Sequence, residues 1–320
     1  MTASGAPGSP SAMHEAQLEV TADTVRALLA AQFPQWSGEP VLHTPGAGTV
    51  NAIFRIGDGL AARFPLVVDD PDARLAALRL EADRAREFAS TASVPCPETV
   101  AIGGPGPGYP GPWAVTTWID GDAATPHVLE ESAAFALDVA GLIHELRDSH
   151  TCGRAFSGTG RGGDLRAHDE WMAACLAKSE GLLDVPALRA AWERFRTLPR
   201  RDPDAMTHGD LIPANLLVRG GRLVGIVDVG GFAPADPALD LVAAWHLFEE
   251  PARGELRAVL RRSIREPDAD EALRWARGAA WAFEQALGLV WYYRLSNPAM
   301  SELGSTALRR IMEADVLSSS

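Results

Sequence analysis

Lysine is nearly absent from this sequence: of the 29 basic residues, Lys178 is the only lysine. The basic residues are outnumbered by 42 acidic ones, which gives a formal net charge of −13 at pH 7. Nucleic acids recruit clustered Lys and Arg to their phosphates, so this balance excludes nucleic acid as the main partner. An acidic surface suits a cationic small molecule better, although acidity also serves solubility alone.

Cysteines and long apolar runs are also scarce. Cys96, Cys152 and Cys175 lie far apart without a CxxC spacing, which argues against a disulfide framework or a zinc site. No apolar run approaches the ~20 residues of a membrane span. The first 12 residues are rich in Ser, Gly, Pro and Ala, and they lack the basic and apolar regions of a signal peptide. We therefore predict a disordered tail over 1–20 and a cytoplasmic protein with reduced thiols.

What the chain does have is a change of pattern near residue 121. A helical pattern over 21–33 is followed by strand-like runs near 41–42, 52–56, 60–64, 100–102 and 113–118, with a helix over 74–89 between them. Helical patterns then cover 129–148, 165–180, 185–198, 237–249, 252–264, 269–295 and 299–316, interrupted by a β-hairpin at 216–227. We predict an α+β fold with a β-rich lobe over 21–121, ending in a hinge at 118–121, and a helical lobe over 122–320.

The sharpest chemical signal is THGDLIPANLLV at 207–218, followed by IVDVG at 226–230. The neighbouring strands are apolar, so Asp210, Asn215 and Asp228 are expected at strand ends near the interior, where polar groups need partners. Mg²⁺ takes oxygen ligands from carboxylates, amides and substrate phosphates. The order and spacing match a phosphotransferase arrangement, with a catalytic Asp, then an Asn, then an Asp-x-Gly after a hairpin. The alternative, a capped hairpin with structural Asp and Asn, explains each residue singly but not the set.

These motifs resemble the aminoglycoside phosphotransferase family, whose members share the two-lobed protein-kinase-like fold. The resemblance covers residues 21–316 and rests on GAGTVN (46–51), LAARFP (60–65), GYP (108–110), WIDG (118–121), the loop 208–218 and DPALDL (236–241). It implies that Asp210 orients or deprotonates the acceptor hydroxyl, and that Asn215 and Asp228 bind Mg²⁺. It also implies structural roles for His208 and Asp240, and ATP or GTP as the co-substrate.

The β-rich lobe is expected to hold the nucleotide. Gly46 and Gly48 let backbone amides approach phosphates closely, although two glycines alone would equally suit an ordinary turn. In the hinge, backbone groups of Trp118 and Ile119 are the expected contacts of the base.

A kinase normally places a lysine on its third strand, paired with a glutamate on the next helix. Here that strand carries Arg63, so we expect Arg63 to hold the phosphates, with Glu81 as its partner and Glu87 as the alternative. Arginine grips phosphate through a planar fork, so the exchange is not conservative. The competing interpretation of Arg63 and Glu81 is a surface ion pair.

The acceptor site is expected between helices of the second lobe. The segment 275–293 is rich in Trp and Tyr, for which core packing is the default, while sugar stacking is the alternative. Glu284 is a candidate for holding an ammonium group, and Asp122, Glu130, Asp169 and Glu170 are further acidic candidates.

Four functions remain open. The first is an antibiotic kinase acting on an aminoglycoside or a related compound, and the second is a metabolic kinase for choline, homoserine or a sugar-like acceptor. A nucleotide-binding pseudokinase is the third. The fourth, a metal-dependent hydrolase using His208, lacks the further histidines of such sites. We expect a Mg²⁺-dependent small-molecule kinase that is a monomer by default.

Overall fold

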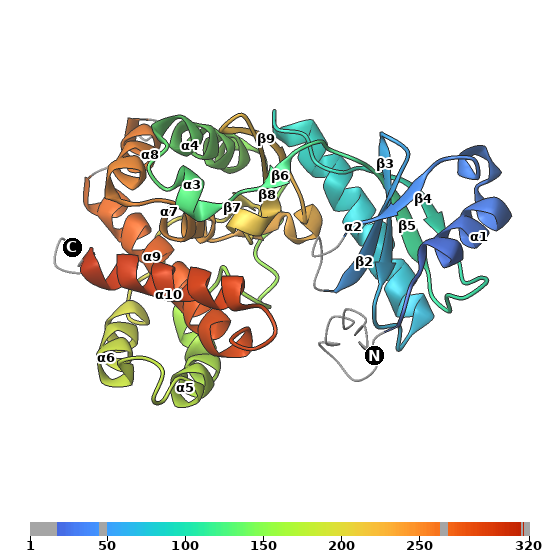
Figure 1. The fold of residues 1–320 in the computed structure, drawn as a ribbon. Coiled ribbons are helices and arrows are strands. Elements are labelled where there is room, and N and C mark those ends of the chain that lie inside the picture. The colour runs from blue at the N-terminus through green and yellow to red at the C-terminus, as the bar shows by residue number, and fades with distance from the viewer. Residues whose placement is uncertain (1–17, 45–49, 263–267, 315, 317–320) are drawn as a thin grey trace, which may run out of the picture. The chain divides into compact units, whose positions relative to one another are not determined.

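The computed structural model describes residues 18–44, 50–262, 268–314 and 316, apart from the side chains of 268 and 269. The chain divides into two compact units, one formed by Met1–Leu78 with Val100–Thr117 and the other by Arg79–Thr99 with Trp118–Ser320. The first is built on a β-sheet and the second is mostly helical (Figure 1). The predicted α+β class is therefore confirmed.

The first unit is a five-stranded sheet with the strand order β1-β2-β3-β5-β4. Its elements are α1 (Ala22–Gln32), η1 (Pro34–Trp36), β1 (Val41–His43), β2 (Asn51–Ile56), β3 (Leu60–Pro65), β4 (Thr99–Gly103) and β5 (Trp113–Thr117). The β2–β3 hairpin turns at Gly57, whose φ of 55° suits a residue without a Cβ. Apolar side chains of α1 pack with Phe54, Phe64 and Trp113 into one core.

The predicted tail reaches into this unit. Of residues 1–20, only 18–20 belong to the described part of the chain. There the Leu18 amide donates a hydrogen bond to the Leu66 carbonyl at 2.8 Å, and Leu18 and Val20 pack against the core. The apolar side chains of Leu18 and Val20 thus attach the end of this segment to the first unit.

The second unit contains the other elements. They are β6 (Asp122–Ala123), α3 (Pro126–Leu129), α4 (Ala133–Asp148), η2 (Leu165–His168), α5 (Asp169–Lys178), α6 (Val185–Phe195), β7 (Ala205–Thr207), η3 (Pro213–Asn215), β8 (Leu216–Arg219), β9 (Arg222–Ile226), η4 (Val229–Gly231), β10 (Ala233–Ala235), η5 (Leu239–Leu241), α7 (Val242–Leu247), α8 (Glu250–Arg262), α9 (Asp268–Tyr292) and α10 (Pro298–Glu313). α9 is buried along most of its length and packs beside α10 (Figure 1).

The helix α2 (Pro71–Thr91) belongs to both units, which differs from the boundary expected at residue 121. Ala85, Phe88 and the following Cys96 are part of the core of the helical unit. The apolar pattern of α2 showed that one face is buried but not in which core, because that depends on which neighbours the helix meets.

The short strands β6, β7 and β10 were not predicted. They have two or three residues each and pair across long sequence distances, β6 with β8 and β7 with β10. No helix in the described part of the chain combines the length and apolarity of a membrane span.

Candidate active site

The predicted catalytic loop runs from the end of β7 to η3 and is held by a buried carboxylate. Asp240 accepts hydrogen bonds from the backbone amides of His208 and Gly209, both at 2.9 Å. The Asp210 amide donates to His208 Nδ1 at 3.2 Å, so His208 Nε2 carries the proton and donates to the Val227 carbonyl at 3.1 Å. These contacts fix the loop against β9, as expected of His208 and Asp240.

Gly209 is required by the backbone of this loop. Its φ is +85°, a region in which a side chain with a Cβ is strained. The left-handed turn at Gly209 lets two successive amides point at Asp240. The next residue, Asp210, then points its side chain away from these anchors.

Asp210 is surrounded by three donors. Arg161 Nη2 lies 2.8 Å and Gln285 Nε2 lies 2.6 Å from Asp210 Oδ1. Asn215 Nδ2 lies 3.2 Å from Asp210 Oδ2 and 2.8 Å from the Asp210 carbonyl. The Asp210 side chain is still 33% exposed, so a ligand can reach it.

The electrostatics keep Asp210 ionised. Burial raises the pKa of Asp210, but the charge and hydrogen bond of Arg161 and the hydrogen bond from Gln285 lower it more. The net pKa lies below the ordinary value, so Asp210 is a carboxylate at neutral pH. A carboxylate in this state can orient a hydroxyl and accept its proton during transfer.

The β8–β9 hairpin brings Asn215 and Asp228 to the same end. Leu216 pairs with Ile226, and the Val227 amide donates to the Asn215 carbonyl at 2.9 Å. Asp228 follows directly, with an exposed side chain and a left-handed backbone (φ 62°, ψ 43°). Aspartate tolerates this region better than most residues, and such backbone outliers cluster at functional sites.

The donor set at this end of the hairpin fits a magnesium ion. Among the described residues, no group of three or more His, Cys, Asp or Glu side chains could hold a metal by itself. The Asn215 amide nitrogen is engaged with Asp210, so its Oδ1 is the atom that could bind a cation, together with the exposed Asp228 carboxylate. One amide and one carboxylate oxygen are a partial set of the kind that Mg²⁺ completes with water and phosphate.

The nucleotide-lobe residues are placed only in part. Gly46 and Gly48 lie outside the described residues. Arg63 is on β3, opposite Ile53 of β2 and Ala114 of β5. Because Arg63 belongs to the first unit and Glu81 to the second, their pairing stays a prediction.

Glu81 lies beside the segment that follows Asp228. A Cβ built on Gly230 would come within 3.1 Å of Glu81 Cγ, so this glycine allows a close approach of α2 to η4. The alternative partner, Glu87, forms an ion pair with Arg154. Its carboxylate is therefore already engaged within the second unit.

The hinge residues lead into β6. Trp118 Nε1 donates to Asp120 Oδ1 at 2.9 Å. The Ile119 side chain packs over Gly225 of β9, where a Cβ would come within 2.7 Å of Ile119 Cγ2. The hinge thus rests on the hairpin that carries Asn215, and the contacts of Trp118 and Ile119 with a base stay a prediction.

The acidic acceptor candidates are mostly engaged. Glu284 is only 4% exposed, and its Oε1 lies 3.0 Å from His168 Nδ1. The other nitrogen of His168 lies 3.2 Å from the Gly160 carbonyl oxygen, so both ring nitrogens face oxygen atoms. Accordingly, the hydrogen bond with Glu284 raises the pKa of His168.

Two more of these candidates, Glu130 and Asp169, form ion pairs with Arg310 and Arg196, respectively. In the aromatic segment, Trp275 and Trp281 belong to the core, as the default interpretation held.

Arg161 is the site residue that the sequence did not reveal. It lies in the segment GTGRGG at 158–163, where Gly158, Gly160 and Gly162 all have positive φ. An arginine held among glycines was the available signal, but a surface loop has the same composition. Its contact with Asp210 joins residues 49 positions apart.

Known proteins resemble this chain in sequence and in fold. An aminoglycoside 3′-phosphotransferase of Escherichia coli is 40% identical over 80 residues, which are 24% of this chain and 29% of that protein. A second such enzyme, from Streptomyces fradiae, is 37% identical over 78 residues and is likewise matched over 29% of its length. The matched stretch is thus under a third of either relative.

Solved phosphotransferase structures share the fold over nearly the whole chain. The GDP complex of wild-type aminoglycoside 2′-phosphotransferase-IIIa superposes with a TM-score of 0.66 at 19% identity, covering 92% of this chain and 100% of that one. Macrolide 2′-phosphotransferase MphH from Brachybacterium faecium superposes with a TM-score of 0.60 at 19% identity, over 90% of this chain and 97% of that one. At these identities the likeness establishes the kinase-like fold. Residues 42–278 match the Phosphotransferase enzyme family, and this chain is a member of it.

Proposed function

We propose that the protein transfers the γ-phosphate of ATP or GTP to a hydroxyl of a small molecule, an aminoglycoside or a related antibiotic, in the presence of Mg²⁺. The observation that carries the proposal is the ionised Asp210 fixed next to Asn215, at the end of the hairpin that also presents Asp228. Family membership supports phosphoryl transfer. Structural neighbours were solved with GDP and with kanamycin, which supports a nucleotide donor and an antibiotic acceptor.

Each residue of the proposed site has its own role in phosphoryl transfer. Asp210 accepts a hydrogen bond from the acceptor hydroxyl, whose oxygen attacks the γ-phosphorus as the bond to the β,γ-bridging oxygen breaks. The hydroxyl proton passes to Asp210 and then to solvent, while the nucleoside diphosphate leaves. Asn215 and Asp228 would hold Mg²⁺, which neutralises charge on the phosphates when bound. Transfer is direct, without a phosphoenzyme.

The test is release of ADP or GDP by the full chain with Mg²⁺ across a panel of aminoglycosides, macrolides, choline, homoserine and sugars. Asp210→Asn keeps the size of the side chain but removes its charge and basicity. We expect it to lower acceptor-dependent turnover by about 10²–10⁴-fold, whereas Asp83→Asn on the exposed face of α2 leaves it unchanged.

The panel also separates the alternatives. Turnover with antibiotics identifies a resistance kinase, and turnover with choline, homoserine or a sugar alone identifies a metabolic kinase. Nucleotide binding without turnover on any acceptor would indicate a pseudokinase. Full activity of Asp210→Asn would remove Asp210 from the mechanism.

A further inference from the structure

Arg161 is built into the site rather than resting on the surface. The Gly162 carbonyl accepts a hydrogen bond from the Asp236 amide at 2.8 Å, and His168 donates to the Gly160 carbonyl at 3.2 Å. Gly162 has a φ of 105°, and a Cβ there would come within 2.6 Å of Ala235 Cβ. The backbone on both sides of Arg161 is therefore fixed, and with it the base of the side chain that reaches Asp210.

One face of α9 completes this support. Arg277 donates to the Gly163 carbonyl at 3.1 Å, Glu284 pairs with His168, and Gln285 donates to Asp210. Glu284 and Gln285 follow Arg277 by seven and eight positions, which is about two helical turns and places all three on the same side of α9. The segment 160–163 and the catalytic carboxylate are thus held by one rigid element.

The donors are distributed unevenly over the two oxygens of Asp210. Among the described residues, Oδ1 accepts hydrogen bonds from both Arg161 and Gln285, whereas Oδ2 accepts one from Asn215 alone. Each carboxylate oxygen has about two acceptor positions. Oδ1 is therefore saturated, and Oδ2 is the atom left to accept the hydroxyl of the acceptor.

Arg161 and Gln285 also carry polar atoms without a hydrogen-bond partner. Among the described residues, the buried atoms without a hydrogen-bond partner include Arg161 Nη1 and Gln285 Oε1, both on the side chains that contact Asp210 Oδ1. Both atoms are buried, so what an acceptor meets is the charge of the Arg161 guanidinium, whose side chain is 22% exposed. This charge attracts a hydroxyl, carbonyl or carboxylate oxygen and repels an ammonium group.

The charges around Asp210 are balanced without a ligand. Asp210 is paired with Arg161, Asp236 with Arg277, and Glu284 with His168, whose pKa this contact raises. An ammonium group next to the reacting hydroxyl would lie close to the Arg161 guanidinium. Asp210, Glu284 and Asp236 are already engaged and offer it no free carboxylate. Two positive charges in contact repel each other strongly inside a protein.

We propose that Arg161 is a positioning and specificity residue, which presents Asp210 Oδ2 to the acceptor and selects a hydroxyl that has no ammonium group beside it. The acceptor class is accordingly a neutral or anionic polyol compound rather than a polycationic aminoglycoside. This rests on the proposed transfer of phosphate to a hydroxyl and, among the acceptors named there, favours a related compound without ammonium groups over an aminoglycoside. It differs from the interpretation, drawn from the net charge, that an acidic surface fits a cationic acceptor.

The test is equilibrium binding of kanamycin, a polycationic probe, to the full chain by isothermal titration calorimetry. Arg161→Gln leaves the Asp210 carboxylate without its cation. Kanamycin should therefore bind to this variant about tenfold more tightly than to the wild type. Arg161→Lys keeps the charge and should retain the weak binding. Arg166→Gln, an exposed arginine of η2, is the matched control and should not change the affinity.

Two further measurements make the result decisive. In the double variant Arg161→Gln/Asp210→Asn the gain should disappear, because the carboxylate that lost its cation is then itself neutral. Maltotriose, an uncharged probe, should gain nothing from Arg161→Gln. A circular dichroism melt confirms that each variant is folded before its affinity is read.

An affinity for kanamycin that is the same in the wild type and Arg161→Gln, or undetectable in both, overturns the proposal, because Arg161 would then exclude nothing. This outcome is distinct from failure of the proposed function, which the acceptor panel reports. A chain that releases no nucleoside diphosphate with any acceptor is no kinase, whatever Arg161→Gln does to binding.

Discussion

At the scale of single residues, the proposed binding of Mg²⁺ by Asn215 and Asp228 can be tested directly. Asp228→Ala removes the exposed carboxylate predicted to bind Mg²⁺. A ligand present at 100 times its Kd stabilises a protein by about 2.7 kcal/mol. We expect Mg²⁺ with ADP or GDP to raise the thermal midpoint of the wild type, and EDTA to abolish most of this shift.

In Asp228→Ala the midpoint should be the same with and without Mg²⁺, as measured by differential scanning fluorimetry. Asp148→Ala, at the exposed end of α4, should keep the Mg²⁺-dependent shift. An undiminished shift in Asp228→Ala would place the metal elsewhere.

His246 gives a second prediction at this scale, on pH. Its side chain is fully buried, and a side-chain hydrogen bond with Gln285 favours the charged ring less than burial disfavours it. Burial lowers the pKa of His246 to about 4. The unfolded chain therefore binds this proton first as pH falls, and stability is lost between about pH 6.5 and pH 4.

His246→Leu should remove this loss, which for a shift of that size is about 3 kcal/mol in the free energy of unfolding. Urea unfolding at pH 7 and at pH 4.5 measures the difference. Equal pH dependence in the wild type and His246→Leu would contradict the neutral, buried ring.

The contribution of His168 to stability depends on pH in the opposite direction. Because the contact with Glu284 raises the pKa of His168, this contribution is present below pH 6.5 and is lost as the pH rises above it.

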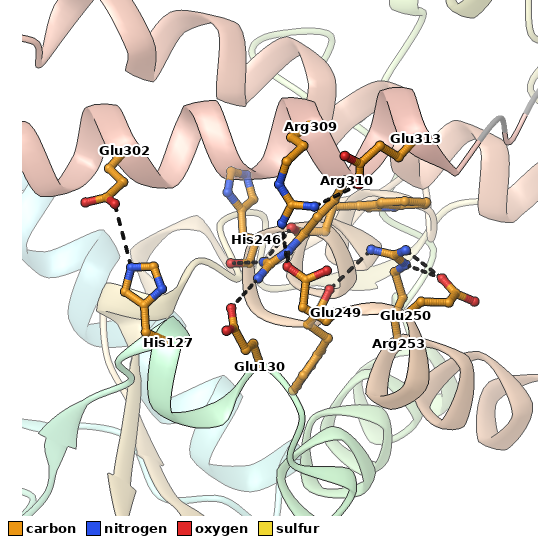
Figure 2. A network of polar contacts seen from close by, with 12 residues as sticks. His127, Glu130, His246, Glu249, Glu250, Arg253, Glu302, Arg309, Arg310 and Glu313 are labelled. Carbon is orange, nitrogen blue, oxygen red and sulfur yellow. Dashed lines mark hydrogen bonds and ion pairs between the residues drawn. The ribbon is translucent and has the colours of Figure 1, made fainter.

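At the scale of elements, α10 is attached to α7 by one buried arginine (Figure 2). Arg310 donates to the carbonyls of Trp245 and His246 at 3.2 and 3.1 Å, which lie at the end of α7 and have no helical partner. It also pairs with Glu249 at 2.8 Å and Glu130 at 2.9 Å. The Arg310 side chain has no exposed area.

Arg310→Met would leave two carboxylates and two carbonyls without this donor. We expect it to lower the free energy of unfolding by about 3–5 kcal/mol, measured by urea denaturation. The neighbouring Arg309 pairs with the same Glu249 but is 47% exposed. Arg309→Met is therefore the matched control and should cost at most about 1 kcal/mol. Equal losses in the two variants would show that the burial of Arg310 is not what matters.

The elements themselves followed from local patterns to different degrees. The β8–β9 hairpin was predictable because two glycines stand at its turn and both strands are apolar. Helix positions were also close, because amphipathic spacing is a local property. The predicted helix over 165–180 begins instead as η2, and α4 starts four residues later than expected, at its Ser132 cap. Caps and first turns depend on contacts that a periodic pattern does not contain.

At the scale of the whole molecule, family membership and fold agree with the prediction from the loop motif, although the structural relatives are only about 19% identical. A fold can be shared at such identities because it is constrained mainly by packing, which many sequences satisfy.

By itself, the sequence determined the two-part architecture, the loop carrying Asp210 and the closeness of Asn215 to Asp228, because turns, periodicity and a hairpin are short-range properties. Only the tertiary structure decided that the second half of α2 joins the helical core, that Glu284 is occupied by His168, and that Arg161 and Gln285 meet on Asp210 Oδ1. The last two contacts with Asp210 span 49 and 75 positions. Contacts over such distances depend on how complete elements pack, and no local pattern encodes them.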